Sequence, residues 1–221
     1  MAKIVFAVIS PHPPIILPNV GSPEDRAQVR NTILALEKLG RELKEANPDS
    51  IIISAPHPDW GFEVPLYFLV KNFKGRIEKV LIGLESPQFY FEEGNKFYQK
   101  IDIGQTFAKI ALIASGDMSH CLKEEGPYGF QPDGPKFDKA LIDALKKKDI
   151  ETILKLDELY PEAGECGLRS FCFLLGILEA WSEDWHPAER GKKPRLAWQP
   201  EILSYEGPFG VGYLVMNFKL K

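Results

Sequence analysis

The chain carries one short motif twice: an apolar, strand-like segment that leads into a histidine between two prolines. The first copy runs through residues 3–10 into Pro11-His12-Pro13, and the second runs through 51–55 into Pro56-His57-Pro58. Proline fixes its own φ angle and biases the preceding residue toward extended backbone, so each copy predicts a strand that ends in a stiff turn. Only four histidines occur in the chain. Two of them in one repeated setting indicate a shared metal or catalytic site at strand ends, where open α/β sheets bind ligands.

The segment between the two copies predicts a helix. Ser22 suits a helix N-cap, Pro23 follows at the first helical position, and apolar residues recur at helical spacing to about Ala46. A strand, a helix and a second strand in this order imply parallel strands joined by a right-handed crossover.

The remaining pattern predicts alternating strands and helices. We expect further strands at 66–70, 79–83, 109–115, 202–205 and 211–218, and helices at 93–106, 135–147, 150–156 and 164–181. The last two strands are joined by the turn 207–210, which indicates a hairpin. The polar stretch 182–200 is expected to form a surface loop, with His186 on the surface.

Composition excludes several classes of protein. A chain of 221 residues fits one domain over 1–221, and its net charge of -4 argues against bulk affinity for nucleic acid. No apolar run is long enough to cross a membrane, and Met1 leads directly into a core strand rather than a signal peptide. Three cysteines cannot all pair within one chain. We therefore expect reduced thiols, a cytoplasmic location and no membrane partner.

His12 and His57 are the first candidates for metal ligands, because two imidazoles at neighbouring strand ends can coordinate one divalent ion. Two residues at the start of the helix predicted at 164–181 compete for the third position. Glu165 would complete the two-histidine, one-carboxylate triad that holds Fe(II), whereas Cys166 would give a softer site suited to zinc, copper or iron. Glu206, at a strand end, is a weaker rival that better fits a solvated turn.

His120 is the candidate proton-transfer group. It follows the strand predicted at 109–115 and should approach the same edge of the sheet, and its pKa is naturally near neutrality. Asp117 lies three residues earlier and could orient the His120 ring or help to place a proton. The alternative is a loop histidine beside a turn made by Asp117.

Four segments together resemble a known family: 10–14 (Ser-Pro-His-Pro-Pro), 56–58 (Pro-His-Pro), 116–120 (Gly-Asp-Met-Ser-His) and 128–138 (Tyr-Gly-Phe through Phe-Asp). Their order and spacing, over nearly the whole chain, resemble the catalytic subunit of class III extradiol ring-cleavage dioxygenases, the LigB-like superfamily. Within it the chain is similar to the LigB-like domain that occurs with Memo-like, AMMECR1-like and radical-SAM proteins.

The resemblance implies an α/β fold with a central, mostly parallel (mixed) sheet and helices on both faces. It implies His12 and His57 as iron ligands, His120 as the acid/base, and Glu165 as the third ligand of a dioxygenase. In Memo-like relatives a Cys-Gly-Arg segment supplies a cysteine ligand, and the segment from Cys166 to Arg169 resembles it.

The function implied is O2-dependent ring cleavage of a catechol-like aromatic at Fe(II), with zinc or copper as alternative metals. Four aromatic residues are expected to wall the substrate pocket: Trp60, Phe62, Tyr128 and Phe130. The alternative function is that of a Memo-like iron or copper protein that acts with an AMMECR1-like or radical-SAM partner without ring cleavage. A zinc hydrolase on the same residues is a third reading. The family also implies a homodimer.

Overall fold

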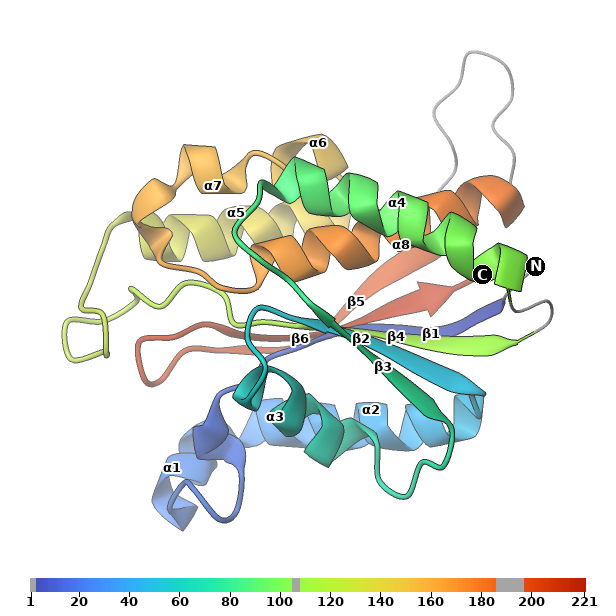
Figure 1. The fold of residues 1–221 in the computed structure, drawn as a ribbon. Helices are drawn as coiled ribbons and strands as arrows, with labels where there is room; N and C mark the ends of the chain where they lie inside the picture. Colours follow the sequence, from blue (N-terminus) through green and yellow to red (C-terminus); the bar gives the residue numbers. More distant parts are fainter. Residues whose placement is uncertain (1–2, 105–107, 186–196) are drawn as a thin grey trace.

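The computed structural model describes residues 3–104, 108–185 and 197–221. Its centre is a six-stranded sheet in the order β3-β2-β4-β1-β6-β5 (Figure 1). The strands are β1 (Lys3–Ser10), β2 (Ser50–Ala55), β3 (Arg76–Leu81), β4 (Lys109–Ser115), β5 (Trp198–Glu206) and β6 (Tyr213–Leu220). The first four pair in parallel, β6 is antiparallel to β1, and β5 is antiparallel to β6. The mixed, mostly parallel sheet is therefore confirmed.

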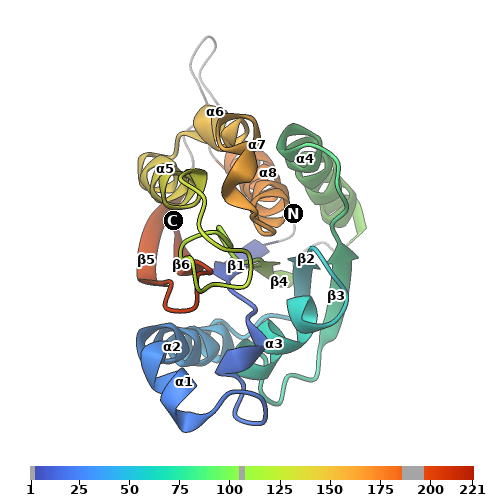
Figure 2. The ribbon, with the colours of Figure 1, turned by 90° about the vertical axis from the view of Figure 1, so that its left-hand side faces the viewer.

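Helices cover both faces of this sheet (Figure 2). One face carries α1 (Pro23–Gln28), α2 (Arg30–Ala46) and α3 (Trp60–Leu69). The other carries α4 (Pro87–Gly104), α5 (Asp133–Lys147), α6 (Ile150–Ile153), α7 (Leu156–Leu159) and α8 (Leu168–Trp185). Two short 3-10 turns, Pro14–Ile16 and Pro161–Ala163, complete the elements. None of the helices described is long and apolar enough to cross a membrane.

The inner parallel strands β1, β2 and β4 are apolar along most of their length because helices cover them on both sides. In β1, Val8 packs into the core beneath α2 and α3, whereas Ile9 packs into the core beneath α4 and α8. In β2, Ile53 and Ile52 divide in the same way. Strands buried on both faces are expected to be apolar at every position rather than at alternate ones.

Helices α4 and α8 cross closely at two glycines. A Cβ at Gly94 would lie 2.1 Å from the Phe173 carbonyl oxygen, and one at Gly176 would lie 2.0 Å from the Phe91 oxygen. Gly94 would weaken a helix in isolation, but here it permits the contact of the two backbones. Helix α4 begins at Pro87, six residues before the start predicted at 93.

The strand predicted at 66–70 is wrong, because these residues belong mainly to α3. Their aromatic and β-branched composition is typical of a strand, and a proline inside a helix is unfavourable. Pro65 does lie inside α3, where it has no N–H to offer the Gly61 carbonyl one turn earlier. The Ser115 hydroxyl donates a hydrogen bond to that carbonyl instead.

Other boundaries also moved. The helix predicted from residue 22 to 46 breaks at Val29 into α1 and α2, although Ser22 caps it with Asp25 as expected. The helix predicted at 150–156 is two short helices, α6 and α7. Helix α8 begins at Leu168, so Glu165 and Cys166 precede it rather than open it. His186 lies outside the described residues, and the described ends of the predicted loop 182–200 belong to α8 and β5.

Candidate metal centre

The register of the parallel strands brings the predicted residues to one edge of the sheet. Strands β1 and β4 pair so that Ser10 lies beside Ser115, and β4 also pairs with β2. His12, His57 and Asp117 each lie two residues beyond the end of one of these strands. The two copies of the motif therefore meet at the carboxyl edge of β1, β4 and β2, as expected.

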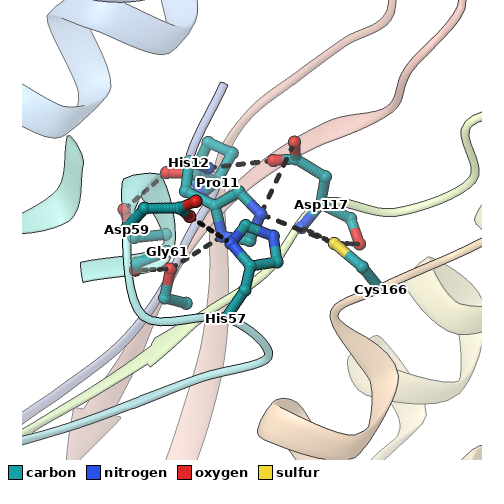
Figure 3. Close-up of polar contacts among 9 residues, drawn as sticks. Pro11, His12, His57, Asp59, Gly61, Asp117 and Cys166 are labelled. Atoms are coloured by element: carbon teal, nitrogen blue, oxygen red, sulfur yellow. Dashed lines mark hydrogen bonds and ion pairs between the residues drawn. The ribbon is translucent and has the colours of Figure 1, made fainter. Parts of the chain in front are cut away.

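Three side chains from distant parts of the chain converge there (Figure 3). The ring centroids of His12 and His57 lie 4.6 Å apart in a T-shaped arrangement. The Cys166 Sγ atom lies 3.5 Å from His12 Nε2. One possible ligand atom from each of the three residues falls within 4.8 Å of the others. This is the group expected of a metal site with two nitrogens and one sulfur.

The proton on the His12 ring can be assigned from its neighbours. His12 Nδ1 lies 2.9 Å from Ser115 Oγ, whose single hydrogen is donated to the Gly61 carbonyl. Since a carbonyl only accepts, Ser115 must accept from His12, which places the imidazole proton on Nδ1. His12 Nε2, the atom beside Cys166, is therefore free to coordinate. Metal-bound histidines usually donate their other N–H in this way.

His57 is oriented in the same sense by a carboxylate. Its Nδ1 lies 2.8 Å from Asp59 Oδ1, so Nδ1 donates to the carboxylate, and Nε2 is the lone-pair nitrogen of the neutral ring. Gly61 gives the ring room, since a Cβ there would lie 3.3 Å from His57 Nδ1 and 3.0 Å from the Cβ of Ala55. In the neutral form, both imidazoles thus have Nε2 available for coordination.

Cys166 reaches the group through a close backbone contact. The Gly167 N–H donates to the Asp117 carbonyl at 2.9 Å, and a Cβ at Gly116 would lie 2.2 Å from the Gly167 Cα atom. The Asp117 N–H donates to Cys166 Sγ at 3.3 Å. The Asp117 carboxylate in turn accepts from the His12 N–H at 2.9 Å. Asp117 therefore connects Cys166 to His12.

Burial sets the charge of the group. It lowers the pKa of His12 to about 3, with a smaller contribution from His57, and raises the pKa of the Cys166 thiol well above its usual value. It also raises the pKa of Asp117 to about 6, against the hydrogen bond from His12. Imidazole must be neutral to coordinate, and a thiol must lose its proton. His12 is already in the coordinating form, whereas the Cys166 thiol would lose its proton when a cation binds.

The two rival carboxylates are engaged elsewhere. Glu165 accepts from the Leu168 N–H at 2.6 Å, where it caps α8, and pairs with Arg169 at 3.0 Å. Glu206 accepts from the Thr32 N–H at 2.8 Å and from the Asn31 amide at 2.9 Å, at the start of α2. Neither joins the group of two imidazoles and a thiol.

His120 lies in the loop after β4, as expected. Its Nε2 atom is buried and has no hydrogen-bond partner among the described residues. Its ring centroid lies 5.1 Å from that of Tyr128, which is largely exposed. Burial lowers the pKa of His120, and the charge of Asp117 opposes this shift. Of the other expected pocket aromatics, Trp60 and Phe130 are exposed, but Phe62 belongs to the core beneath the sheet.

Three supporting residues were not assigned a role from the sequence. Asp59 could have been found, because a carboxylate two residues after a histidine can reach its ring. Ser115 supports His12 only through the pairing of β1 with β4, which no local pattern shows. Asp138 is buried and accepts from the Ser119 N–H at 2.8 Å and the Tyr205 hydroxyl at 2.6 Å. It anchors the loop that carries His120.

Comparison with known proteins now adds a family. Residues 57–216 match the family of the catalytic LigB subunit of aromatic ring-opening dioxygenase. The chain belongs to the LigB family. The match includes His57, Asp117, His120 and Cys166, and begins after His12. The resemblance predicted from the four motifs is confirmed.

A relative and a solved structure extend the comparison. This LigB-family chain is 30% identical to Protein CA_C1420 of Clostridium acetobutylicum over 280 aligned residues, which cover 95% of this chain and 56% of that protein. The chain thus spans little more than half the length of that relative. It also matches uncharacterized protein JW3007 from Escherichia coli with a TM-score of 0.50 and 16% identity, over 96% of this chain and 99% of that one. This second likeness shows a shared fold.

The donor set fits a transition metal ion. Imidazole nitrogen suits iron, copper and zinc, and a thiolate shifts the preference toward softer ions. Both imidazoles have their Nδ1 proton held by a neighbour, as coordination through Nε2 requires. The set differs from the carboxylate-containing triad of non-haem Fe(II) oxygenases in that sulfur stands where a carboxylate oxygen would.

Proposed function

We propose that this LigB-family protein is a metal-dependent dioxygenase that opens a catechol-like aromatic ring with O2, and that His12, His57 and Cys166 hold its Fe(II) ion. The observation that carries the proposal is the convergence of two unprotonated imidazole nitrogens on one thiol within 4.8 Å. Bound Fe(II) would supply open coordination positions and the redox chemistry that joins an aromatic diol to O2. Cys166 takes the third position in this proposal, because Glu165 is occupied by Leu168 and Arg169.

His120 moves the protons in this proposal. Its buried Nε2 has no protein partner in the described structure, and burial lowers the pKa of the ring, so the imidazole is neutral near pH 7. A neutral imidazole can accept a proton from a substrate hydroxyl and return it later. The Tyr128 ring, 5.1 Å from His120, offers a flat wall to an aromatic substrate.

Asp117 acts as a positioning residue rather than as a proton carrier. Its carboxylate holds the His12 backbone, and its own backbone N–H holds Cys166 Sγ. The electrostatic effect of Asp117 on His120 opposes the effect of burial and keeps the imidazole more basic than burial alone would leave it. Asp117 therefore positions both His12 and Cys166, and it also raises the basicity of His120.

The test is oxygen uptake by the Fe(II)-loaded chain. The protein is purified and loaded without air, then supplied with a panel of catechols and isotopically labelled O2. We expect uptake with at least one catechol and a ring-opened product that carries both labelled oxygen atoms. His120→Asn should retain the iron and lose roughly 10²- to 10⁴-fold in kcat. Iron-loaded protein that consumes no O2 across the panel would contradict the proposal.

A second candidate function is favoured by Cys166 itself. A thiolate gives a softer centre than a carboxylate, which suits a Memo-like iron or copper protein that does not cleave rings. Competition between Fe(II) and Cu(I) for the metal-free chain distinguishes the two: preference for Cu(I), together with no O2 uptake, supports the second candidate. The homodimer and the AMMECR1-like or radical-SAM partner stay predictions in either case.

A further inference from the structure

A sizeable cavity lies away from the metal centre. Its volume is about 660 Å³, within the usual range of small-molecule sites. It is lined by the C-terminal half of α2, the end of α3 and the loop 71–75 that leads into β3. Figure 1 shows these segments at the end of the sheet where β2 and β3 begin, opposite the strand ends that carry His12 and His57. A six-residue strand spans roughly 20 Å, so the two sites are separate.

Cations surround this cavity. Arg41, Lys44, Lys71 and Lys74 line it, with Glu37 as the only acidic residue of the lining. None of the four basic side chains forms an ion pair with a described residue, and Lys71 alone has an aromatic contact, at 5.6 Å from the Tyr67 ring centroid. Four unpaired cations gathered in a chain of net charge -4 indicate an anionic ligand.

The ends of α2 and α3 do not cancel these charges. Each helix C-terminus carries about half a negative charge, and lysines near such ends are often explained by this dipole alone. Two helix ends and Glu37 together offset about two of the four positive charges. A net positive charge of about two remains at the cavity, which favours a ligand that carries phosphate.

The walls favour a ligand with a flat apolar part. Of the apolar residues that line the cavity, Phe73 is partly exposed and offers its ring, whereas Leu43, Phe68 and Leu69 are buried core residues. Gly75 leaves room for the Phe73 ring, since a Cβ there would lie 2.4 Å from its Cζ atom. Asn47 and Asn72 also line the cavity, in left-handed backbone conformations with φ of 47° and 62°. Asn47 adopts this conformation as the C-cap of α2, a position where asparagine is common.

We propose that this cavity binds a nucleoside diphosphate, with the phosphates against the four cations and the base against the apolar wall near Phe73. Lysine and arginine are the usual phosphate-binding residues, and their charged hydrogen bonds are stronger than neutral ones. A base supplies the flat apolar surface that an inorganic phosphate lacks. The site is independent of the metal centre and of the activity proposed for it.

The experiment is calorimetric titration of the full chain with ADP, adenosine and pyrophosphate. We expect saturable binding of ADP, and weaker binding of adenosine and of pyrophosphate, since each offers one half of the contacts. Arg41→Gln with Lys71→Gln should weaken ADP binding by at least roughly tenfold. Lys146→Gln with Lys147→Gln is the matched control, because it also removes two positive charges and both residues are exposed in the last turn of α5. It should bind ADP as the wild type does.

The outcomes that overturn the proposal are distinct. No saturable binding at millimolar ADP, or equal binding by the Arg41/Lys71 double variant and the control, removes the site. Pyrophosphate that binds as tightly as ADP removes the nucleoside. Amide NMR shifts locate the ligand: ADP should shift Gly40 and Gly75, and shifts confined to Gly116 and Gly167 would contradict the assignment. Unchanged thermal unfolding of each variant verifies its fold, and Cys166→Ala should bind ADP normally.

Discussion

The two copies of the histidine motif have the same sequence pattern but different surroundings. His12 is only 3% exposed, and its ring is held by Ser115 from the neighbouring strand β4. The side chain of His57 is 41% exposed, and its ring is held by Asp59 from its own loop. The motif directs each histidine to the edge of the sheet. The residue that orients His12 is therefore brought to it by strand pairing, whereas the residue that orients His57 is its neighbour in the sequence.

The largest effects should come from removing the ligands themselves. His12→Ala and His57→Ala should both abolish metal retention, but His12→Ala should also cost about 2 kcal/mol in free energy of unfolding because it empties a buried position. His57→Ala should change stability by less than about 1 kcal/mol. Metal content by mass spectrometry and denaturant unfolding measure these effects. Full metal content in either variant, or loss of metal in a His120→Ala control, would contradict the site.

Removal of the side chain that orients each ring should lower metal affinity by different factors at the two histidines. Ser115→Ala leaves the buried His12 N–H without a partner, and we expect metal affinity to fall by about 100-fold. Asp59→Ala lets water replace the carboxylate at exposed His57, and the loss should be nearer tenfold. Competition with a coloured chelator measures both affinities. Equal losses would show that burial does not distinguish the two copies.

Asp138 gives a pH test of the loop that carries His120. Burial raises its pKa to about 7, above the value of about 4 in an unfolded chain. Its contribution to stability is therefore fully present below about pH 4 and is lost as the pH rises toward 7. The stability of the wild type relative to Asp138→Asn should fall by about 2–4 kcal/mol over this window. A difference that stays constant with pH, measured by urea unfolding, would refute this account of Asp138.

The smallest effect on the metal should come from Glu165. Glu165→Gln weakens the cap of α8 and the pair with Arg169, which should cost about 1 kcal/mol of stability. Metal content should be unchanged, because the carboxylate lies outside the group. Its neighbour Cys166→Ala is the matched comparison and should lose the metal. The reverse pattern would restore Glu165 as the ligand.

The sequence predicted most of the residues at the carboxyl edge of the sheet but not the long-range contacts that position them. Apolar strands followed by Pro-His-Pro placed His12 and His57, because strand and turn signals are local. Such signals could not choose between Glu165 and Cys166, which are adjacent in the chain and separate only in the loop before α8. That choice depends on the contact of Gly116 with Gly167, which forms across the fold.

The strand wrongly predicted at 66–70 has the same cause: contacts that form across the fold decide it. Residues 66–70 have strand-like composition, yet they form the end of α3 because that helix buries Phe68 and Leu69 against the sheet. Pro65, a residue that is unfavourable inside a helix, frees the Gly61 carbonyl for Ser115. The proline inside α3 thus permits the hydrogen bond from Ser115 to Gly61, and Ser115 in turn orients His12.

X-ray absorption at the iron edge tests the central claim most directly, because it reports the atoms bound to the metal. The Fe(II)-loaded wild type should show a sulfur neighbour together with imidazole nitrogens, and Glu165→Gln should show the same spectrum. In Cys166→Ser, any iron that remains should have no sulfur neighbour. A wild-type spectrum with nitrogen and oxygen alone would contradict a centre built from His12, His57 and Cys166.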